Sequence, residues 1–266
     1  MGALDQKVAV VTGGGAGIGR GIARRLARAG ATVVVADIDN DAGAKVAEEL
    51  KQLGPVGLFV QTDVTQKDQV IAAIDRARSE FGGIDVLVSN AYTLSPNVPI
   101  EDKTDEMLDH VLHGGLWPTW WGMKHAMPMM RQRGGGRIIN LYSGDAESGA
   151  WLRADYVISK SAILGLTRNA AHEWARFGIT CNLICPAAAG TAFVAAAKAN
   201  PAHAEAFRAR NPMGYMGDPE EDIAPVAVFL ASAAARYVTG ELIHVDGGQH
   251  LPRRHSRPAE FQPGPA

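Results

Sequence analysis

Cysteine is scarce in this sequence, and neither sign of charge dominates it. Among 266 residues there are only two cysteines, Cys181 and Cys185, four positions apart in an alternating, strand-like run. That spacing separates them by about 13 Å along an extended chain, too far for a disulfide. We therefore expect two buried free thiols, without partners spaced for a metal. The formal net charge of −2 offers no basic face for nucleic acid or a membrane surface.

Long apolar runs are also missing. No stretch of about 18 uninterrupted apolar residues occurs, which excludes a membrane-spanning helix. The first residues, MGALDQKVAVVTGGG, run directly into a strand-like segment without the regions of a signal peptide. We expect a cytoplasmic protein that binds neither membrane nor nucleic acid.

Apolar segments rich in Val and Ile alternate with segments of helical periodicity. The strand-like segments are 8–11, 32–37, 57–60, 84–89, 137–142, 179–185 and 241–245. The clearest helical segments are 17–29, 41–53, 66–81 and 156–177. Apolar strands that alternate with helices are typical of a parallel sheet covered on both faces. The pattern predicts a single α/β domain over residues 1–250.

Two segments interrupt this rhythm. The Ala-rich segment 187–216 contains Pro201 and Pro212 and is predicted to form a helical lid between two strands. The segment 251–266 contains four prolines and has no periodicity. We interpret it as an extended or disordered C-terminal tail.

A glycine-rich turn follows the first strand-like segment. Such a turn lets a pyrophosphate approach the backbone, and the helix after it offers free N–H groups and the positive end of its dipole. The turn therefore predicts a dinucleotide site, against the alternative of a purely structural turn. The predicted contacts are Gly13, Gly15, Gly17, Ile18 and Gly19.

An acidic residue, Asp37, ends the second strand-like segment about 20 positions after the glycine turn. It can bind a ribose diol and repels a 2′-phosphate, and no Arg or Lys lies in the turn or directly after Asp37. This favours NAD over NADP, although Asp37 could instead cap the next helix. Asp63, followed by Val64, ends the third strand-like segment beside the expected adenine edge. Its alternative role is a helix cap with Thr65.

Further motifs resemble those of the short-chain dehydrogenase/reductase family. TGGGAGIG (12–19) is similar to its TGxxxGxG turn, SNA (89–91) to its NNAG, and Tyr156-x-x-x-Lys160 to its YxxxK. Ser143 lies 13 residues before Tyr156, where the family's serine falls. Cys185–Thr191 is similar to PGxxxT, and VTGELIHVDGG (238–248) to the last strand.

The resemblance covers about residues 7–248 and carries several implications. It implies a doubly wound Rossmann-type sheet of about seven strands, a nicotinamide cofactor and commonly a tetramer, so we expect a homo-oligomer. It also implies cofactor contacts from Asn90, Ala91, Pro186, Ala189 and Thr191.

Tyr156 and Lys160 lie four residues apart and so share one helix face. A free tyrosine has a pKa near 10, and a nearby ammonium lowers it towards the range of a useful base. We predict that Tyr156 is the general acid/base, that Lys160 tunes it and holds the nicotinamide ribose, and that Ser143 binds the substrate oxygen. The predicted reaction is NAD-dependent interconversion of a secondary alcohol and a ketone.

Alternative functions remain open beside this one. One is an NADPH-dependent ketoreductase, for example on a 3-oxoacyl thioester, and another is a catalytically silent nucleotide-binding subunit. The departures from the family pattern at Tyr92, Gly115 and Ala187 favour the silent subunit. An enoyl reductase is disfavoured because its usual tyrosine–lysine spacing is longer.

Gly115 stands where the family usually carries an asparagine that holds a relay water. Because Pro118 has no N–H, the carbonyl of Gly114 loses its helical donor. We expect the helix to kink at 114–118 and the water to bind a main-chain oxygen; the alternative is a bend for packing alone. Residues at helical spacing beside it form a stripe predicted to be core or subunit interface: His113, Trp117, Trp120, Trp121 and Lys124.

The substrate pocket is expected to be formed by the lid and by loop ends. The candidate lining residues are Thr93, Leu94, Asp145, Glu147, Trp151, Phe193 and Met213. Trp151 and Phe193 favour a ring-sized or acyl alcohol or ketone. Asp145 and Glu147 could bind a second hydroxyl, or could simply be solvated loop charges.

Overall fold

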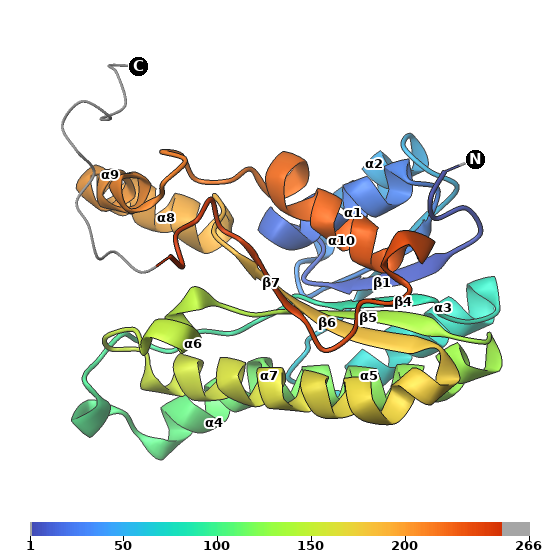
Figure 1. Ribbon diagram of the computed structural model, residues 1–266, viewed down its shortest axis with the longest axis horizontal. Helices are drawn as coiled ribbons and strands as arrows, with labels where there is room; N and C mark the ends of the chain where they lie inside the picture. The colour runs from blue at the N-terminus through green and yellow to red at the C-terminus, as the bar shows by residue number, and fades with distance from the viewer. Residues whose placement is uncertain (1, 252–266) are drawn as a thin grey trace.

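The computed structural model describes residues 2–251 and forms a parallel sheet between two layers of helices (Figure 1). The sheet has seven strands in the order β3-β2-β1-β4-β5-β6-β7. Their bounds are β1 Val8–Thr12, β2 Thr32–Asp37, β3 Gly57–Gln61, β4 Val86–Ser89, β5 Gly136–Leu141, β6 Ile179–Pro186 and β7 Leu242–Val245. The seven predicted strands and the α/β class are confirmed; most of the predicted tail lies outside the described residues.

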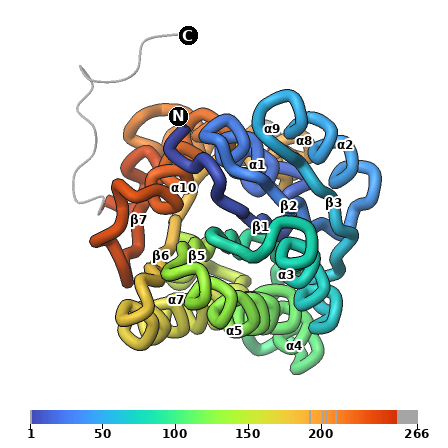
Figure 2. The backbone as a smooth tube through the Cα atoms, turned by 90° about the vertical axis from the view of Figure 1, so that its right-hand side faces the viewer, coloured from blue at the N-terminus to red at the C-terminus, as the bar shows by residue number. Residues whose placement is uncertain are grey.

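Helices cover both faces of the sheet, as Figures 1 and 2 show. One face carries α1 Gly17–Arg28, α2 Asn40–Lys51 and α10 Ala224–Ala231. The other carries α3 Lys67–Phe81, α5 Leu116–Gln132 and α7 Ala154–Trp174. Shorter helices are α4 Asp105–Gly114, α6 Gly144–Ser148, α8 Thr191–Ala199 and α9 Pro201–Arg210. Single 3₁₀ turns are η1 Ile100–Asp102, η2 Ala175–Phe177 and η4 Ala233–Ala235, and η3 Pro219–Ile223 is a π turn.

The strands are mostly apolar, because the central ones are buried on both faces. In β6, Cys181 packs in the cluster beneath α3, α5 and α7, while Ile184 packs in the cluster beneath α1 and α10. The two cysteines are buried and free, as expected. Among the described helices, none is both long and apolar enough to cross a membrane.

The strand order places the carboxyl ends of β1 and β4 side by side at the centre of the sheet. From β1 the chain winds outwards through β2 and β3, then crosses back to β4 on the other side. Ligands of doubly wound sheets bind in the crevice where the strand order reverses in this way. The predicted site residues follow the strands that end at this edge.

The segment 187–216 contains two helices, α8 and α9, beyond the carboxyl ends of the strands (Figure 1). They pack on each other through Phe193 and Phe207, whose ring centroids lie 5.8 Å apart in an edge-to-face arrangement. The helical character predicted for this segment is therefore present.

The helix interruption predicted at 114–118 is also present. Helix α4 ends at Gly114 and α5 begins at Leu116, with Gly115 between them at φ −128° and ψ −69°. The carbonyl of Gly115 accepts hydrogen bonds from the Thr119 hydroxyl at 2.8 Å and from its backbone N–H at 3.4 Å. Pro118, which has no N–H to offer Gly114, explains why the helix breaks here. The relay water stays a prediction.

Candidate active site

The glycine turn after β1 is held in place by Asn90 and Thr12. The Asn90 amide donates to the carbonyls of Thr12 and Gly13, at 2.9 and 3.1 Å. The Thr12 hydroxyl accepts from the backbone N–H groups of Asn90 and Ala91, at 3.0 and 3.1 Å. In this structure Asn90 therefore fixes the shape of the turn by bonding its backbone.

The turn fits a dinucleotide pyrophosphate because glycine has no side chain to keep the pyrophosphate away from the backbone. The packing of the turn leaves no room for side chains at these positions. A Cβ at Gly19 would lie 2.1 Å from the carbonyl oxygen of Gly13, and Gly13 itself has φ +64°. Helix α1 begins at Gly17, and its N-cap residue, Ala16, has no side chain that could bond the first N–H groups. These groups and the helix dipole suit a bound anion.

Asp37 ends β2 directly beside the turn. Its carboxylate accepts a hydrogen bond from the Gly15 N–H at 2.8 Å. The N-cap of α2 is Asp39, which accepts from Asp41 and Ala42, so Asp37 is not needed as a cap. Asp63 accepts from the backbone and hydroxyl of Thr65, at 2.9 and 2.8 Å. These bonds form a turn before α3, whose N-cap is Gln66, so Asp63 is not the cap of that helix.

Ser143, Tyr156 and Lys160 come from two neighbouring elements. Ser143 follows β5 and caps α6 by accepting from the Asp145 N–H. Tyr156 and Lys160 lie in α7, and the Lys160 ammonium donates to the carbonyl of Leu141 at 2.8 Å. The Lys160 Nζ lies 5.8 Å from the centre of the Tyr156 ring. The two residues share a helix face, as predicted.

Burial has the largest effect on the pKa values of Tyr156 and Lys160. Burial raises the pKa of Tyr156, whereas the Ser143 hydroxyl and the Arg153 guanidinium lower it. Burial also lowers the pKa of Lys160 to about 7. The sequence predicted that Lys160 would lower the pKa of Tyr156. In the structure the pKa of Tyr156 is raised overall, and the groups that oppose this rise are Ser143 and Arg153.

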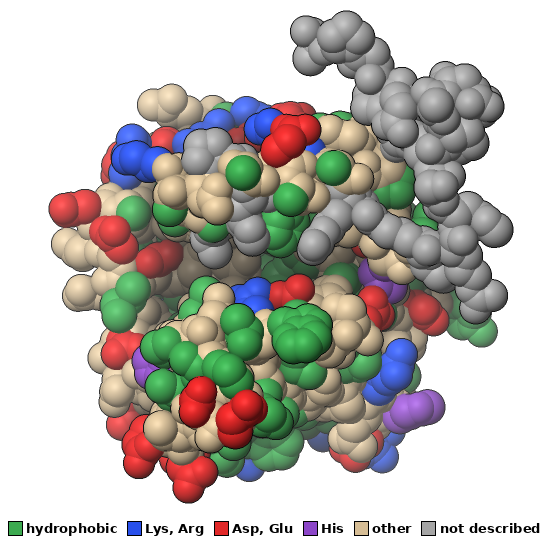
Figure 3. All heavy atoms as spheres, turned by 90° about the vertical axis from the view of Figure 1, so that its left-hand side faces the viewer, with side chains coloured by type: hydrophobic (Ala, Val, Ile, Leu, Met, Phe, Trp, Pro, Cys, Tyr) green, Lys and Arg blue, Asp and Glu red, His purple; other side chains and the backbone are tan. Residues whose placement is uncertain are grey.

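A cavity of about 1060 Å³ joins the predicted catalytic residues to the glycine turn. Figure 3 shows this face of the molecule, hollowed between its upper and lower halves. The cavity is lined by all three predicted catalytic residues. The predicted cofactor contacts that line it are Gly13, Ile18, Asn90, Ala91, Pro186 and Thr191. The predicted substrate contacts that line it are Leu94, Asp145, Glu147 and Phe193.

Three predicted pocket residues do not line this cavity. Trp151 is 91% exposed on the surface, and Met213 is 63% exposed. The Thr93 hydroxyl donates to the carbonyl of His110 at 3.1 Å, so this side chain is directed to α4. These expectations are corrected because loop side chains take their direction from tertiary contacts, which sequence spacing does not specify.

Several lining residues were not predicted from the sequence. Tyr92 contacts both Lys160 and Tyr156, and Arg153 forms an ion pair with Asp145. His250 and Gln249 line the cavity from the end of the described chain. The departure of Tyr92 from the family pattern was the one signal available for any of them.

A possible metal-binding group also lies at this wall. Ligand atoms of Glu147, Cys185 and His244 lie within 4.8 Å of one another. A hydrogen bond of 2.8 Å joins His244 to Glu147. Burial raises the pKa of Cys185 to about 12, so the thiol is protonated at neutral pH. These contacts explain the cluster without an ion.

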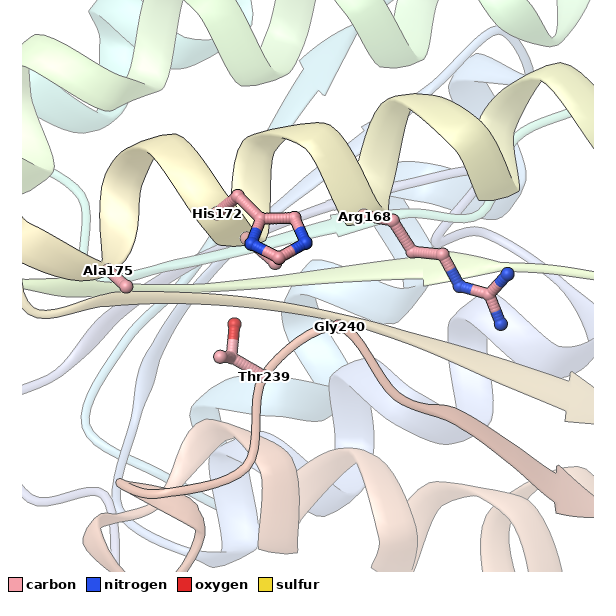
Figure 4. Close-up of a pocket in the computed structure, with 6 residues that line it drawn as sticks. Arg168, His172, Ala175, Thr239 and Gly240 are labelled. Atoms are coloured by element: carbon pink, nitrogen blue, oxygen red, sulfur yellow. The ribbon is translucent and has the colours of Figure 1, made fainter.

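A second hollow of about 390 Å³ lies between α7 and the loop before β7. Figure 4 shows the His172 ring of α7 directed towards Thr239 of that loop, while the Arg168 side chain extends away from it along the helix. Its lining includes none of the predicted site residues. The larger cavity is therefore the candidate active site.

Comparisons with known proteins agree with this fold and site. A family model described as enoyl-(acyl carrier protein) reductase matches residues 13–250. The cis-4-hydroxycyclohexanecarboxylate dehydrogenase of Sinomonas cyclohexanicum is 40% identical, over 92% of this chain and 97% of the relative. The 3beta-hydroxysteroid dehydrogenase 2 of Eggerthella lenta is 34% identical, over 92% and 95%. The crystal structure of levodione reductase aligns with a TM-score of 0.87 and 30% identity, over 93% of this chain and 98% of that chain.

These matches span nearly the whole chain and are similar in fold as well as in sequence. The chain belongs to the short-chain dehydrogenase/reductase family. It is an oxidoreductase of the kind that acts on alcohol and ketone groups.

Proposed function

We propose that this protein is an NAD-dependent dehydrogenase of ring-sized secondary alcohols, with Tyr156 as general acid/base. The observation that carries the proposal is the single cavity lined by Ser143, Tyr156 and Lys160 together with the glycine turn. A nucleotide bound at the turn and an alcohol bound near Tyr156 would therefore share one continuous space.

The residues of the site divide the work of proton transfer. In alcohol oxidation the Tyr156 phenolate accepts the proton of the substrate hydroxyl, while the Ser143 hydroxyl donates a hydrogen bond to the substrate oxygen. The nicotinamide, when bound, supplies the hydride acceptor. Lys160 holds a positive charge beside the phenolate, and the Arg153 guanidinium, which lies over the Tyr156 ring, also stabilises the negative charge of the phenolate. In ketone reduction Tyr156 returns the proton.

The preference for NAD rests on Asp37. Its carboxylate lies at the end of β2, 2.8 Å from the Gly15 N–H. A ribose diol can replace this backbone donor, whereas a 2′-phosphate would meet a like charge.

The proposed substrate class rests on the cavity and on the relatives. Leu94 and Phe193 give one part of the cavity an apolar lining, while Asp145 and Arg153 give another part charge. Two relatives are named for a hydroxycyclohexanecarboxylate and a hydroxysteroid, both ring compounds with a hydroxyl group. We infer a cyclic secondary alcohol with a second polar group.

Titration of NADH and NADPH into the protein, followed by tryptophan fluorescence, tests the cofactor. We expect NADH to bind more tightly, and Asp37→Ala to weaken NADH binding by about tenfold or more, because the ribose loses its acceptor. Asp41→Ala, in the exposed first turn of α2, is the matched control. Tighter binding of NADPH would instead support the ketoreductase alternative.

Turnover of cyclohexanol and cis-4-hydroxycyclohexanecarboxylate with NAD tests the reaction. Tyr156→Phe removes the proton acceptor and is expected to lower kcat by about 10²- to 10⁴-fold, with NADH binding retained. Cofactor binding without turnover of any alcohol in a wider screen would favour the silent subunit.

A further inference from the structure

The ring of Tyr92 contacts both of the α7 side chains on which the proposed function depends. Tyr92 follows β4 by three residues. The Lys160 Nζ lies over its ring, 4.4 Å from the centroid. The Tyr156 ring meets it edge to face, with centroids 4.9 Å apart and planes inclined by 79°. Tyr92 therefore contacts both the predicted general base and the cation beside it.

Gly115, at the break between α4 and α5, makes room for this ring. A Cβ built at Gly115 would lie 2.3 Å from Cε2 and 2.9 Å from Cδ2 of Tyr92, and 2.8 Å from the Ser159 hydroxyl. Real Cβ contacts essentially never come this close, so a side chain at 115 and the present ring position at 92 exclude each other. The two residues are sterically complementary.

The hydroxyl of Tyr92 does not explain the position of its ring. It is buried beside Ser159, whose hydroxyl lowers the pKa of Tyr92 against the larger, opposite effect of burial. The contacts of Tyr92 with Lys160 and Tyr156 are made by its ring, so the ring is the part of Tyr92 that bears on the site.

The face of an aromatic ring attracts a cation, and it does so most strongly where water is excluded. Lys160 is 4% exposed, and burial lowers its pKa to about 7. The groups that face it are the Leu141 carbonyl from β5, the Cys185 thiol from β6, and the Tyr92 and Tyr156 rings. Around Tyr156 the charged groups are Arg153 and Asp145. With Cys185 protonated, the ammonium is supported by the Leu141 carbonyl, which accepts its hydrogen bond, and by the face of the Tyr92 ring, which lies nearer to it than the Tyr156 ring.

We propose that Tyr92 is a positioning residue that holds the Lys160 ammonium beside Tyr156 through the face of its ring, and that the absence of a side chain at Gly115 permits this arrangement. The proposal rests on the proposed function, in which Tyr156 and Lys160 carry out proton transfer. It assigns a role to two of the residues that depart from the family pattern.

A titration of Lys160 tests this role without any turnover. In protein labelled with ¹³C at lysine Cε, the Lys160 resonance is assigned by its loss in Lys160→Met, and its shift is followed against pH. Tyr92→Leu removes the ring face and is expected to lower the pKa of Lys160 by about one pH unit. Tyr92→Phe keeps the ring and is expected to restore the wild-type midpoint. Equal midpoints in all three proteins would overturn the proposal.

Steady-state kinetics separate this inference from the proposed function. With NAD and cyclohexanol, Tyr92→Leu is expected to lower kcat about tenfold at pH 7 and to move the kcat midpoint to higher pH, with KM little changed. Tyr92→Phe keeps the wild-type midpoint. An inactive wild type would count against the proposed function alone, since the Lys160 titration still decides the role of Tyr92.

Gly115→Ala supplies a second route if Tyr92→Leu does not fold. The new Cβ must displace the Tyr92 ring, so the Lys160 pKa is expected to fall although Tyr92 is unchanged. Gly165→Ala in α7, where a Cβ would meet nothing within 4 Å, is the matched control. A Gly115→Ala protein with the wild-type Lys160 midpoint would contradict the proposed complementarity.

Discussion

The guanidinium of Arg153 lies against the ring of Tyr156, with its central carbon 4.3 Å from the ring centroid. Arg153 also forms an ion pair with Asp145 at the wall of the cavity. A cation in this place stabilises the phenolate more than the neutral phenol, so it lowers the pKa of Tyr156. Asp145 raises the pKa of Tyr156. The ion pair of Arg153 with Asp145 therefore has two opposing effects on the pKa of the phenol.

Arg153→Met should therefore slow alcohol oxidation at neutral pH. Without the guanidinium the pKa of Tyr156 rises further, and less phenolate is present. We expect kcat at pH 7 to fall several-fold and the kcat midpoint to move to higher pH, as measured in pH-rate profiles with NAD. Arg153→Lys keeps the charge and should shift less. Arg168→Met, at the second hollow (Figure 4), should leave the pH-rate profile unchanged. If its kcat midpoint also moved, the effect of Arg153→Met could not be assigned to the contact of Arg153 with Tyr156.

Asn90→Asp should destabilise the glycine turn, although the new side chain has nearly the same volume as the old one. The Asn90 amide donates to two backbone carbonyls, and a carboxylate in its place would face both oxygens without a proton to share. We expect a loss of about 2–3 kcal/mol in the free energy of unfolding and weaker NADH binding. Urea unfolding and fluorescence titration measure the two effects, and unchanged values would show that the clamp is dispensable.

Much of the fold could be predicted because burial on both faces leaves a plain pattern in the strands. Segments such as 32–37 are apolar on consecutive residues, and each predicted strand end lies within two residues of the observed one. The helix break at 114–118 was predictable as well, since Pro118 must deprive a carbonyl of its donor. The strand pattern and the helix break were predictable because each depends on a short stretch of the sequence.

The details of the site were less predictable because they depend on side-chain directions set by distant elements. Trp151 was expected in the pocket and lies on the surface. Tyr92 reaches Tyr156 from a distant segment of the chain, and this contact does not follow from sequence spacing. Arg153, by contrast, is the N-cap of α7 and lies only three residues before Tyr156. The steric match of Tyr92 with Gly115 joins residues 23 positions apart, which requires the folded arrangement of β4 and α5.

The exposed tryptophans of α5 are expected to lie in the subunit interface of the predicted homo-oligomer. Trp117 and Trp120 are 40% and 42% exposed, and Trp117 stacks on Trp121 with ring centroids 5.9 Å apart. Exposed aromatic patches often mark interfaces. We expect Trp117→Ser with Trp120→Ser to reduce the molar mass measured by light scattering, whereas Trp151→Ser should not. The same mass in all variants would remove this helix from the interface.

A buried ion pair beside Tyr156 should make stability depend on pH in the acid range. Lys103 donates to Asp155 at 2.9 Å, and both side chains are buried. Burial alone would raise the pKa of Asp155, but hydrogen bonds from Ser95 and Lys103 lower it below its ordinary value. The contribution of Asp155 is therefore complete at neutral pH and is lost as the pH falls below about 4.

Asp155→Asn should expose this dependence directly. At pH 7 it leaves Lys103 buried without its counter-ion, and we expect a loss of about 3–5 kcal/mol in the free energy of unfolding. The difference from wild type should shrink as the pH falls below about 4, because the unfolded wild-type chain then takes up a proton on Asp155 that the folded protein, with its lowered pKa, does not. Asp75→Asn, in a more exposed pair with His125, should cost less than about 1 kcal/mol. Urea unfolding of wild type, Asp155→Asn and Asp75→Asn from pH 7 to pH 3.5 measures the free energy lost in each variant. If the loss in Asp155→Asn stayed constant over this range, the pKa of Asp155 would be the same in the folded and unfolded protein, against the prediction.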